Sequence, residues 1–278
     1  MRVETIGDAT LYLGDCREVL PALPPVDTVV TDPPYAVTDN SWDTPIDLDI
    51  FWSLVWKCTK QNAAICVFSQ QPFTSQLILS NKQYFRYDLV WMKRKYTGFL
   101  NAKKMPLRAH ENICVFYRKL PIYHPQKFYR DTPSYRGPGK RASVNYSKYV
   151  ENMDTGLKDG SRYPLSIIDV EYESIFFKKA PYPMHPTQKT VQIMQYLIKT
   201  YSNSGDTILD QFMGSGTTGV AAVALGRKFI GIEQDSAYFD TCCRRIEEVV
   251  SRPPLLKFAA NDNPPQQEQL PLEELCAR

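Results

Sequence analysis

The stretch TILDQFMGSGTTGVAA, Thr207–Ala222, decides the fold. It opens with a short apolar strand, Thr207–Leu209, which ends at Asp210 and is followed by the glycine turn Gly214–Gly216. The small apolar residues after the turn predict a helix over Thr217–Leu225. Glycines allow the backbone of such a strand-to-helix turn to approach a ligand closely. The stretch therefore predicts an α/β fold that binds a ligand at the carboxyl edge of its sheet.

An acidic residue stands at the end of the next predicted strand. That strand, Phe229–Ile232, is followed by Glu233, whose carboxylate can accept hydrogen bonds from both hydroxyls of a ribose. The glycine turn lacks the GxGxxG spacing of a dinucleotide site and the GK[ST] ending of a phosphate loop. A ligand with a ribose but no pyrophosphate, such as S-adenosylmethionine, suits this turn. The alternative is a tight turn that binds nothing.

The remaining predicted strands are short continuous apolar runs, which are typical of strands buried on both faces. They are Thr10–Gly14, Asp27–Thr31, Ala63–Phe68, Tyr87–Met92 and Asn112–Tyr117. Helical spacing of apolar residues predicts further helices over Ile50–Cys58, Thr187–Tyr201 and Ser236–Val250. We expect a seven-stranded, mostly parallel sheet in which only Asn112–Tyr117 runs antiparallel.

A second motif, Asp32-Pro33-Pro34-Tyr35, follows the strand that ends at Thr31. The two prolines forbid a helix just past the strand, so Asp32 and Tyr35 should stand at the carboxyl edge, beside Asp210. An aromatic amino group is a poor nucleophile because its lone pair is delocalised into the ring. Asp32, helped by the carbonyl of Pro33, can accept hydrogen bonds from the N–H groups of such an amine and so free its lone pair. Tyr35 can stack on the aromatic base that carries the amine. The alternative is a proline-rich turn that merely ends a core strand.

Positive charge is concentrated in one part of the chain. The whole sequence has a net charge of +3, but the window from Lys82 to Lys148 holds 16 Lys and Arg against 3 acids. A block this basic predicts contact with nucleic acid, although any single residue in it could be an ordinary solvated lysine or arginine. The residues expected to contact phosphates are Lys93, Arg94, Lys95, Lys103, Lys104, Arg108, Lys140 and Arg141.

These motifs resemble the β-class DNA amino-methyltransferases, which methylate N6 of adenine or N4 of cytosine. In that family DPPY precedes FxGxG, with target recognition between them, and here Asp32–Tyr35 precedes Phe212–Gly216. The resemblance covers roughly residues 8–248 and includes LYLGDCREVL before DPPY, WMK with a later AHE, and HPTQK at His185–Lys189. It implies a Rossmann-like S-adenosylmethionine-dependent methyltransferase fold with a circularly permuted motif order. The target-recognition segment matches no specificity subgroup.

The resemblance also implies roles for individual residues. Glu233 would bind the ribose and Asp15 the adenine amino group of the cofactor. Lys189, and His185 close to it, would lie near the methionine moiety, with Lys189 at its carboxylate; the alternatives are a solvated lysine and a histidine that caps or packs. The residues expected to form the rest of the cofactor site are Asp210, Phe212, Gly214, Ser215, Gly216 and Thr217.

The function that follows is transfer of a methyl group from S-adenosylmethionine to N6 of adenine in duplex DNA. The target base must leave the stack to reach Asp32, so base flipping is expected. Asp rather than Ser at the first motif position favours adenine, by resemblance. The alternatives are N4-cytosine methylation, RNA adenine methylation and a DNA-binding protein that has lost activity. Homodimerisation is also implied by resemblance alone.

Four segments are expected along the 278 residues. Residues 1–119 and 181–251 would be the catalytic and cofactor-binding halves of one domain, with a target-recognition insertion at 120–180 and a disordered tail at 252–278. No apolar run is long enough to span a membrane, and a cytoplasmic protein is expected. The seven cysteines contain no CxxC pair and the three histidines are dispersed, so reduced thiols and no metal site are predicted.

Overall fold

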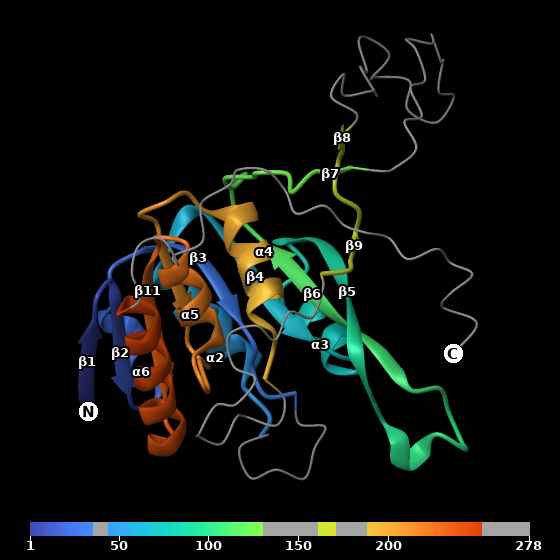
Figure 1. Ribbon diagram of the computed structural model, residues 1–278, viewed down its shortest axis with the longest axis horizontal. Helices are drawn as coiled ribbons and strands as arrows, with labels where there is room; N and C mark the ends of the chain where they lie inside the picture. The colour runs from blue at the N-terminus through green and yellow to red at the C-terminus, as the bar shows by residue number, and fades with distance from the viewer. Residues whose placement is uncertain (36–43, 130–160, 171–187, 252–278) are drawn as a thin grey trace, which may run out of the picture. The chain divides into compact units, whose positions relative to one another are not determined.

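The computed structural model describes residues 1–35, 44–129, 161–170 and 188–251, which contain one nine-stranded sheet and the helices packed on it. The sheet has the order β1-β2-β11-β10-β3-β4-β6-β5-β9 (Figure 1). Its strands are β1 Arg2–Ile6, β2 Ala9–Leu13, β3 Val26–Thr31, β4 Thr59–Ser69, β5 Phe85–Thr97, β6 Arg108–Phe116, β9 Ile167–Ile168, β10 Thr207–Asp210 and β11 Lys228–Glu233.

Most neighbouring strands are parallel, which confirms the α/β class and the large mostly parallel sheet. Strand β6 runs antiparallel to both β4 and β5, as the sequence predicts for Asn112–Tyr117. All seven predicted strands are present, but the expected total of seven is wrong for the described residues. The additional strands are β1, which is antiparallel to β2 and mostly exposed, and the two-residue β9 beside β5.

Helices cover both faces of this sheet. They are α1 Cys16–Val19, α2 Leu48–Lys57, α3 Phe73–Ser80, α4 Val191–Tyr201, α5 Thr217–Ala224 and α6 Ser236–Val250, with the 3-10 turns η1 Leu20–Ala22 and η2 Phe99–Asn101. The predicted start of α4 at Thr187 is too early, because residues 188–190 are not helical. The Thr190 hydroxyl accepts the amide hydrogen of Ile193 at 3.4 Å and caps the helix there.

Alternate residues of the central strands point into two separate hydrophobic clusters. Val29 of β3 and Ile65 of β4 pack in the cluster that contains residues of α2 and α3. Val30 and Cys66, their neighbours in sequence, pack in the cluster formed with α4, α5 and α6 (Figure 1). Burial on both faces explains why these strands read as continuous apolar runs.

Strands β5 and β6 continue past their neighbours as a two-stranded arm, seen at the lower right of Figure 1. The arm turns at Gly98, whose φ of +94° suits glycine, and continues into η2. Because β5 is parallel to β3 and β4, the tip of the arm lies beyond the carboxyl edge of the sheet. The arm is therefore on the side where the chain leaves β3 at Asp32.

The chain divides into two compact units, and residues Pro125–Leu165 belong to the smaller one. In its described part, β7 (Phe128–Tyr129) pairs antiparallel with β8 (Ser161–Arg162), and Lys127 Nζ lies 5.7 Å from the Tyr163 ring centre. Residues 166–170, inside the predicted insertion, belong to the larger unit and contribute β9. The predicted tail, 252–278, lies outside the described residues.

The described cysteines are free thiols, and five of the six are buried. Burial raises the pKa of each, to about 11 for Cys58 and Cys114. No group of three or more His, Cys, Asp or Glu side chains within the described ranges could hold a metal ion. In the same ranges no helix combines the length and apolar character that crossing a membrane requires.

Candidate active site

The carboxyl ends of four neighbouring strands bring the predicted motifs together. Strand β10 ends at Asp210 and β3 leads directly into Asp32, and the Thr31 hydroxyl donates to Asp210 Oδ1 at 2.8 Å. On the other side of β10, β11 ends at Glu233, whose carbonyl accepts the amide hydrogen of Gly14 after β2 at 2.9 Å. This edge is where open parallel sheets bind ligands.

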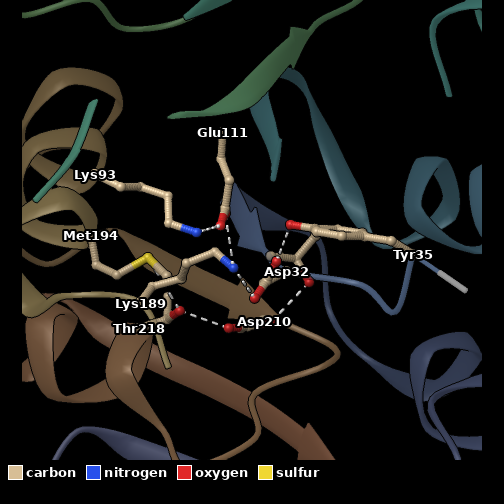
Figure 2. A network of polar contacts seen from close by, with 9 residues as sticks. Asp32, Tyr35, Lys93, Glu111, Lys189, Met194, Asp210 and Thr218 are labelled. Atoms are coloured by element: carbon tan, nitrogen blue, oxygen red, sulfur yellow. Dashed lines mark hydrogen bonds and ion pairs between the residues drawn. The ribbon is translucent and has the colours of Figure 1, made fainter. Parts of the chain in front are cut away.

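The turn after β3 presents a carboxylate beside an aromatic ring. The Tyr35 hydroxyl donates a short hydrogen bond to Asp32 Oδ1 (Figure 2). The Tyr35 ring stacks on Phe73 of α3 with a centroid separation of 5.4 Å, and Pro33, the residue after Asp32, is buried. Asp32 is partly exposed, so its carboxylate can reach a ligand at this edge.

The turn after β10 needs glycine at two positions. Gly214 has φ +50° and Gly216 has φ +80°, in the left-handed region. A Cβ on Gly214 would have no atom within 4 Å, whereas a Cβ on Gly216 would lie 2.3 Å from Cys242 Sγ of α6. Gly214 therefore faces open space, and Gly216 lies directly against α6.

Glu233 closes the other side of this turn. Its Oε2 accepts the amide hydrogen of Gly214 at 2.9 Å and its Oε1 accepts that of Asp235 at 2.8 Å. Burial raises the pKa of the Glu233 carboxyl above its usual range. An acid fixed by two backbone donors, beside a glycine that faces open space, fits the ribose of a nucleoside ligand such as S-adenosylmethionine.

Asp210 is hydrogen-bonded to residues on both sides of the glycine turn and to β3. Its side chain is buried and accepts hydrogen bonds from Thr31, from Thr218 of α5 at 2.6 Å and from the amide of Phe212 at 3.1 Å. Burial raises the pKa of Asp210 to about 7. These hydrogen bonds fix Asp210 in the turn, and a direct contact of Asp210 with the cofactor stays a prediction.

Two residues missed by the sequence analysis hold this turn. Arg245 of α6 is fully buried, and its Nη1 donates to the Ser215 carbonyl at 2.5 Å and to Thr217 Oγ1 at 3.3 Å. The Ser215 hydroxyl donates to Gln188 Oε1 at 3.1 Å, which joins the HPTQK segment to the turn. A charged residue at a core position of an amphipathic helix was the available signal for Arg245.

Asp15 and Phe212 lie beside these residues in structural roles. The Asp15 side chain caps α1 by accepting the amide hydrogen of Arg17 at 2.8 Å. It also forms an ion pair with the Arg17 side chain, which lowers the pKa of Asp15. The Phe212 ring stacks on Phe51 of α2 at a centroid separation of 6.5 Å. A cofactor contact for either residue stays a prediction.

Lys189 is a buried side chain between two carboxylates of the protein, which excludes the alternative of a solvated lysine. Its Nζ lies 2.6 Å from Asp32 Oδ2 and 3.1 Å from Glu111 Oε2 (Figure 2). Glu111, in the AHE sequence of β6, had no predicted role.

The residues predicted to contact DNA differ in where the structure places them. Lys103, Lys104 and Arg108 are exposed on the arm, where phosphates can reach them. Lys93 is corrected, because its Nζ donates to Glu111 Oε1 at 2.8 Å and its side chain is only 15% exposed. Arg94 and Lys95 are residues of β5, and their contact with DNA stays a prediction. Lys140 and Arg141 lie outside the described residues, as does His185, which was predicted to lie near the cofactor.

Known proteins are similar in sequence to this chain. A family model described as DNA methylase matches residues 26–244. The DNA adenine methyltransferase YhdJ of Escherichia coli (strain K12) is 27% identical over 253 residues, which cover 86% of this chain and 82% of the relative. The type II methyltransferase M.HinfI of Haemophilus influenzae is 27% identical over 287 residues, which cover 91% and 73% respectively.

Solved structures share the fold at lower identity. The M1.HpyAVI complex with S-adenosylmethionine superposes with a TM-score of 0.57 at 22% identity, covering 86% of this chain and 98% of the other. The PvuII DNA methyltransferase (cytosine-N4-specific) has a TM-score of 0.62 at 16% identity, covering 89% and 93%. TTHA0409 of Thermus thermophilus, a putative DNA modification methylase complexed with S-adenosyl-L-methionine, has a TM-score of 0.52 at 20% identity, covering 87% and 95%.

Proposed function

Because this chain belongs to the DNA methylase family, we propose that it transfers the methyl group of S-adenosylmethionine to N6 of adenine in duplex DNA. The observation that carries the proposal is the junction of β3 and β10. There the Thr31–Asp210 hydrogen bond holds the Asp32 turn directly beside the glycine turn. One methyl transfer needs the amino group and the methyl donor within contact of each other, and this junction provides that proximity.

The residues of the chain supply positioning and charge. S-adenosylmethionine, when bound, supplies a methyl group on a sulfonium that is already a good leaving group. The Asp32 carboxylate accepts the N–H groups of the target amine, which localises the nitrogen lone pair. It is also placed to receive the proton that the methylated nitrogen loses. Tyr35, whose ring is stacked on Phe73, is proposed to stack on the flipped base.

Adenine is favoured over cytosine by two arguments. The motif begins with Asp32 rather than Ser, and YhdJ, a relative over most of its length, is named a DNA adenine methyltransferase. The PvuII neighbour, at 16% identity, bears on the fold alone. Cytosine N4 is the second candidate because it is also a conjugated amine that Asp32 could bind.

Product analysis tests the function. Duplex DNA incubated with the protein and S-adenosylmethionine should give N6-methyladenine after nucleoside digestion and mass spectrometry. N4-methylcytosine as the main product would overturn the adenine assignment, but the proposed role of Asp32 toward a conjugated amine would still hold. A main product of 5-methylcytosine would contradict both, since that carbon requires a cysteine nucleophile that the motif lacks. Tritium transfer to duplex DNA and to RNA of the same sequence separates DNA from RNA substrates.

The proposed cofactor site gives a binding prediction. Glu233→Ala removes a carboxylate acceptor from the ribose, and each hydrogen bond to a charged group is worth about 1.5–3 kcal/mol, so affinity for S-adenosylmethionine should fall about tenfold or more. Isothermal titration calorimetry measures the change. Glu247→Ala removes an exposed carboxylate from α6 and serves as the control. Equal affinities of a folded Glu233→Ala and wild type would remove the ribose role.

The arm gives a prediction for DNA binding. Reversing Lys103 and Lys104 to Glu should weaken binding to all sequences and reduce the log–log salt slope by about 0.9 for each phosphate that is no longer neutralised. Fluorescence anisotropy over a salt series measures this slope. Reversing Lys57 and Lys228, exposed at the amino edge of the sheet, gives the same charge change as a control. If both pairs change the slope equally, the arm has no special part in binding.

Three further features complete the proposal. Residues 120–180, apart from the β9 segment that joins the main sheet, are proposed to recognise the target sequence, by resemblance. A homodimer is proposed on the same ground, and sedimentation over a concentration range, with and without DNA, tests it. A cytoplasmic location is proposed because the DNA substrate and S-adenosylmethionine are both intracellular.

A further inference from the structure

Four charged side chains of alternating sign form a chain of contacts that begins at Asp32. Asp32 Oδ2 lies 2.6 Å from Lys189 Nζ, which lies 3.1 Å from Glu111 Oε2, and Glu111 Oε1 lies 2.8 Å from Lys93 Nζ. Figure 2 shows them as one continuous chain of contacts. They come from separate elements: the turn after β3, the residue before the Thr190 cap of α4, β6 and β5. Their formal charges sum to zero.

Burial makes each partner dependent on the others. The side chains of Lys189 and Glu111 are 5% and 8% exposed, and isolated charges at such positions are strongly destabilising. Burial lowers the pKa of Lys189, but attraction to Asp32 and Glu111 outweighs it, so the pKa is raised and the side chain is an ammonium. For Glu111, burial raises the pKa and the two lysines outweigh that effect, so the pKa is lowered.

One end of this chain of ion pairs is the carboxylate of Asp32, which is the proposed acceptor for the target amine. The Tyr35 hydroxyl bonds Oδ1 of Asp32 and Lys189 bonds Oδ2, so the carboxylate is held at both oxygens. Asp210, a second carboxylate, lies close enough to Asp32 that their repulsion raises its pKa further. The ammonium of Lys189 beside Asp32 offsets the repulsion between the two carboxylates that share this edge of the sheet.

We propose that Lys189 is the positioning residue of the methyl transfer, which orients the Asp32 carboxylate and balances its charge, and that Glu111 and Lys93 hold Lys189 in place. The inference rests on the proposed function. It reassigns Lys189 from the cofactor to the target amine, because its ammonium is already neutralised by two carboxylates at 2.6 and 3.1 Å. It also lies 5.7 Å from the Tyr35 ring centre and 5.4 Å from that of Phe68, so little of it remains open to another anion.

Kinetics of Lys189→Met separate the two roles. The variant should keep wild-type affinity for S-adenosylmethionine by calorimetry, while kcat at saturating cofactor and DNA falls about 100-fold, since a misplacement of about 1 Å costs this much. Lys189→Arg, which retains the charge, should recover part of kcat.

Two further variants test the inference even if Lys189→Met does not fold. Glu111→Gln keeps the shape and the hydrogen-bond acceptor of the side chain, and should reduce kcat about tenfold with cofactor affinity unchanged. Lys60→Met breaks the exposed ion pair with Asp27, at 2.6 Å, and should leave kcat unchanged. Urea denaturation confirms that each variant is folded before kinetics are measured.

The outcomes are distinct. Weakened S-adenosylmethionine binding by Lys189→Met, with normal kcat at saturation, would assign Lys189 to the cofactor and overturn the inference. An unchanged kcat in folded Lys189→Met and Glu111→Gln would overturn it as well. Wild-type protein that methylates no DNA would instead contradict the proposed function, before any variant is compared.

Discussion

Asp32→Ala should reduce methyl transfer about 10³-fold or more while the protein still binds S-adenosylmethionine. The carboxylate acts on the target amine in the transition state, and groups of this kind contribute factors of about 10² to 10⁴. The cofactor site lies in the neighbouring turn, where Gly214 and Glu233 bond each other directly and do not involve Asp32. Single-turnover transfer of labelled methyl to duplex DNA measures the loss, and calorimetry measures cofactor binding.

An isosteric variant and a control make this prediction specific. Asp32→Asn keeps the size of the side chain but removes the charge that Lys189 faces, and it should lose nearly as much activity as Asp32→Ala. Asp27→Asn changes a carboxylate at the other end of the same strand, where it pairs with Lys60, and should retain activity. If Asp32→Asn transfers methyl groups at the wild-type rate, the charge of Asp32 has no part in the chemistry.

The parts of the fold and site that could be predicted are those encoded locally. Strand β3 and the DPPY turn are consecutive in sequence, as are β10 and the glycine turn, so a continuous apolar run followed by Pro or Gly predicts each unit. Parallel pairing then brings their ends to one edge, and this agrees with the Thr31–Asp210 hydrogen bond. The edge strand β1 was missed because its residues are mostly exposed and carry little apolar signal.

The ion network could not be predicted because its members are distant in sequence. Lys93 and Glu111 meet through the antiparallel pairing of β5 and β6, and Lys189 joins them from a segment 78 residues beyond Glu111. A lysine in a basic window is ordinarily solvated, so Lys93 was interpreted as a phosphate contact. Arg245 of α6 presents the same difficulty, since its partners are backbone and hydroxyl groups of a turn about 30 residues earlier.

Gly216→Ala should destabilise the protein by about 2–5 kcal/mol and abolish cofactor binding at ordinary temperatures. A left-handed conformation costs a residue with a Cβ about 1–2 kcal/mol, and Gly216 has φ +80°. The new Cβ would also lie 2.3 Å from Cys242 Sγ and 3.2 Å from the Cys242 Cα, and overpacking of this kind costs about 1–3 kcal/mol. Because the backbone of α6 is part of the clash, α5 must shift away, and the turn between β10 and α5 shifts with it.

Gly214→Ala provides a matched control within the same turn. Gly214 has φ +50°, so it carries a similar conformational cost of about 1–2 kcal/mol, but its Cβ would have no atom within 4 Å. Urea denaturation should therefore show a clearly larger loss of stability for Gly216→Ala than for Gly214→Ala. Replacing Cys242 by Ala as well should recover part of the loss at Gly216 and none at Gly214, since only Gly216 faces that thiol. Equal losses in the two single variants would mean that backbone strain alone, and not contact with α6, makes glycine necessary in this turn.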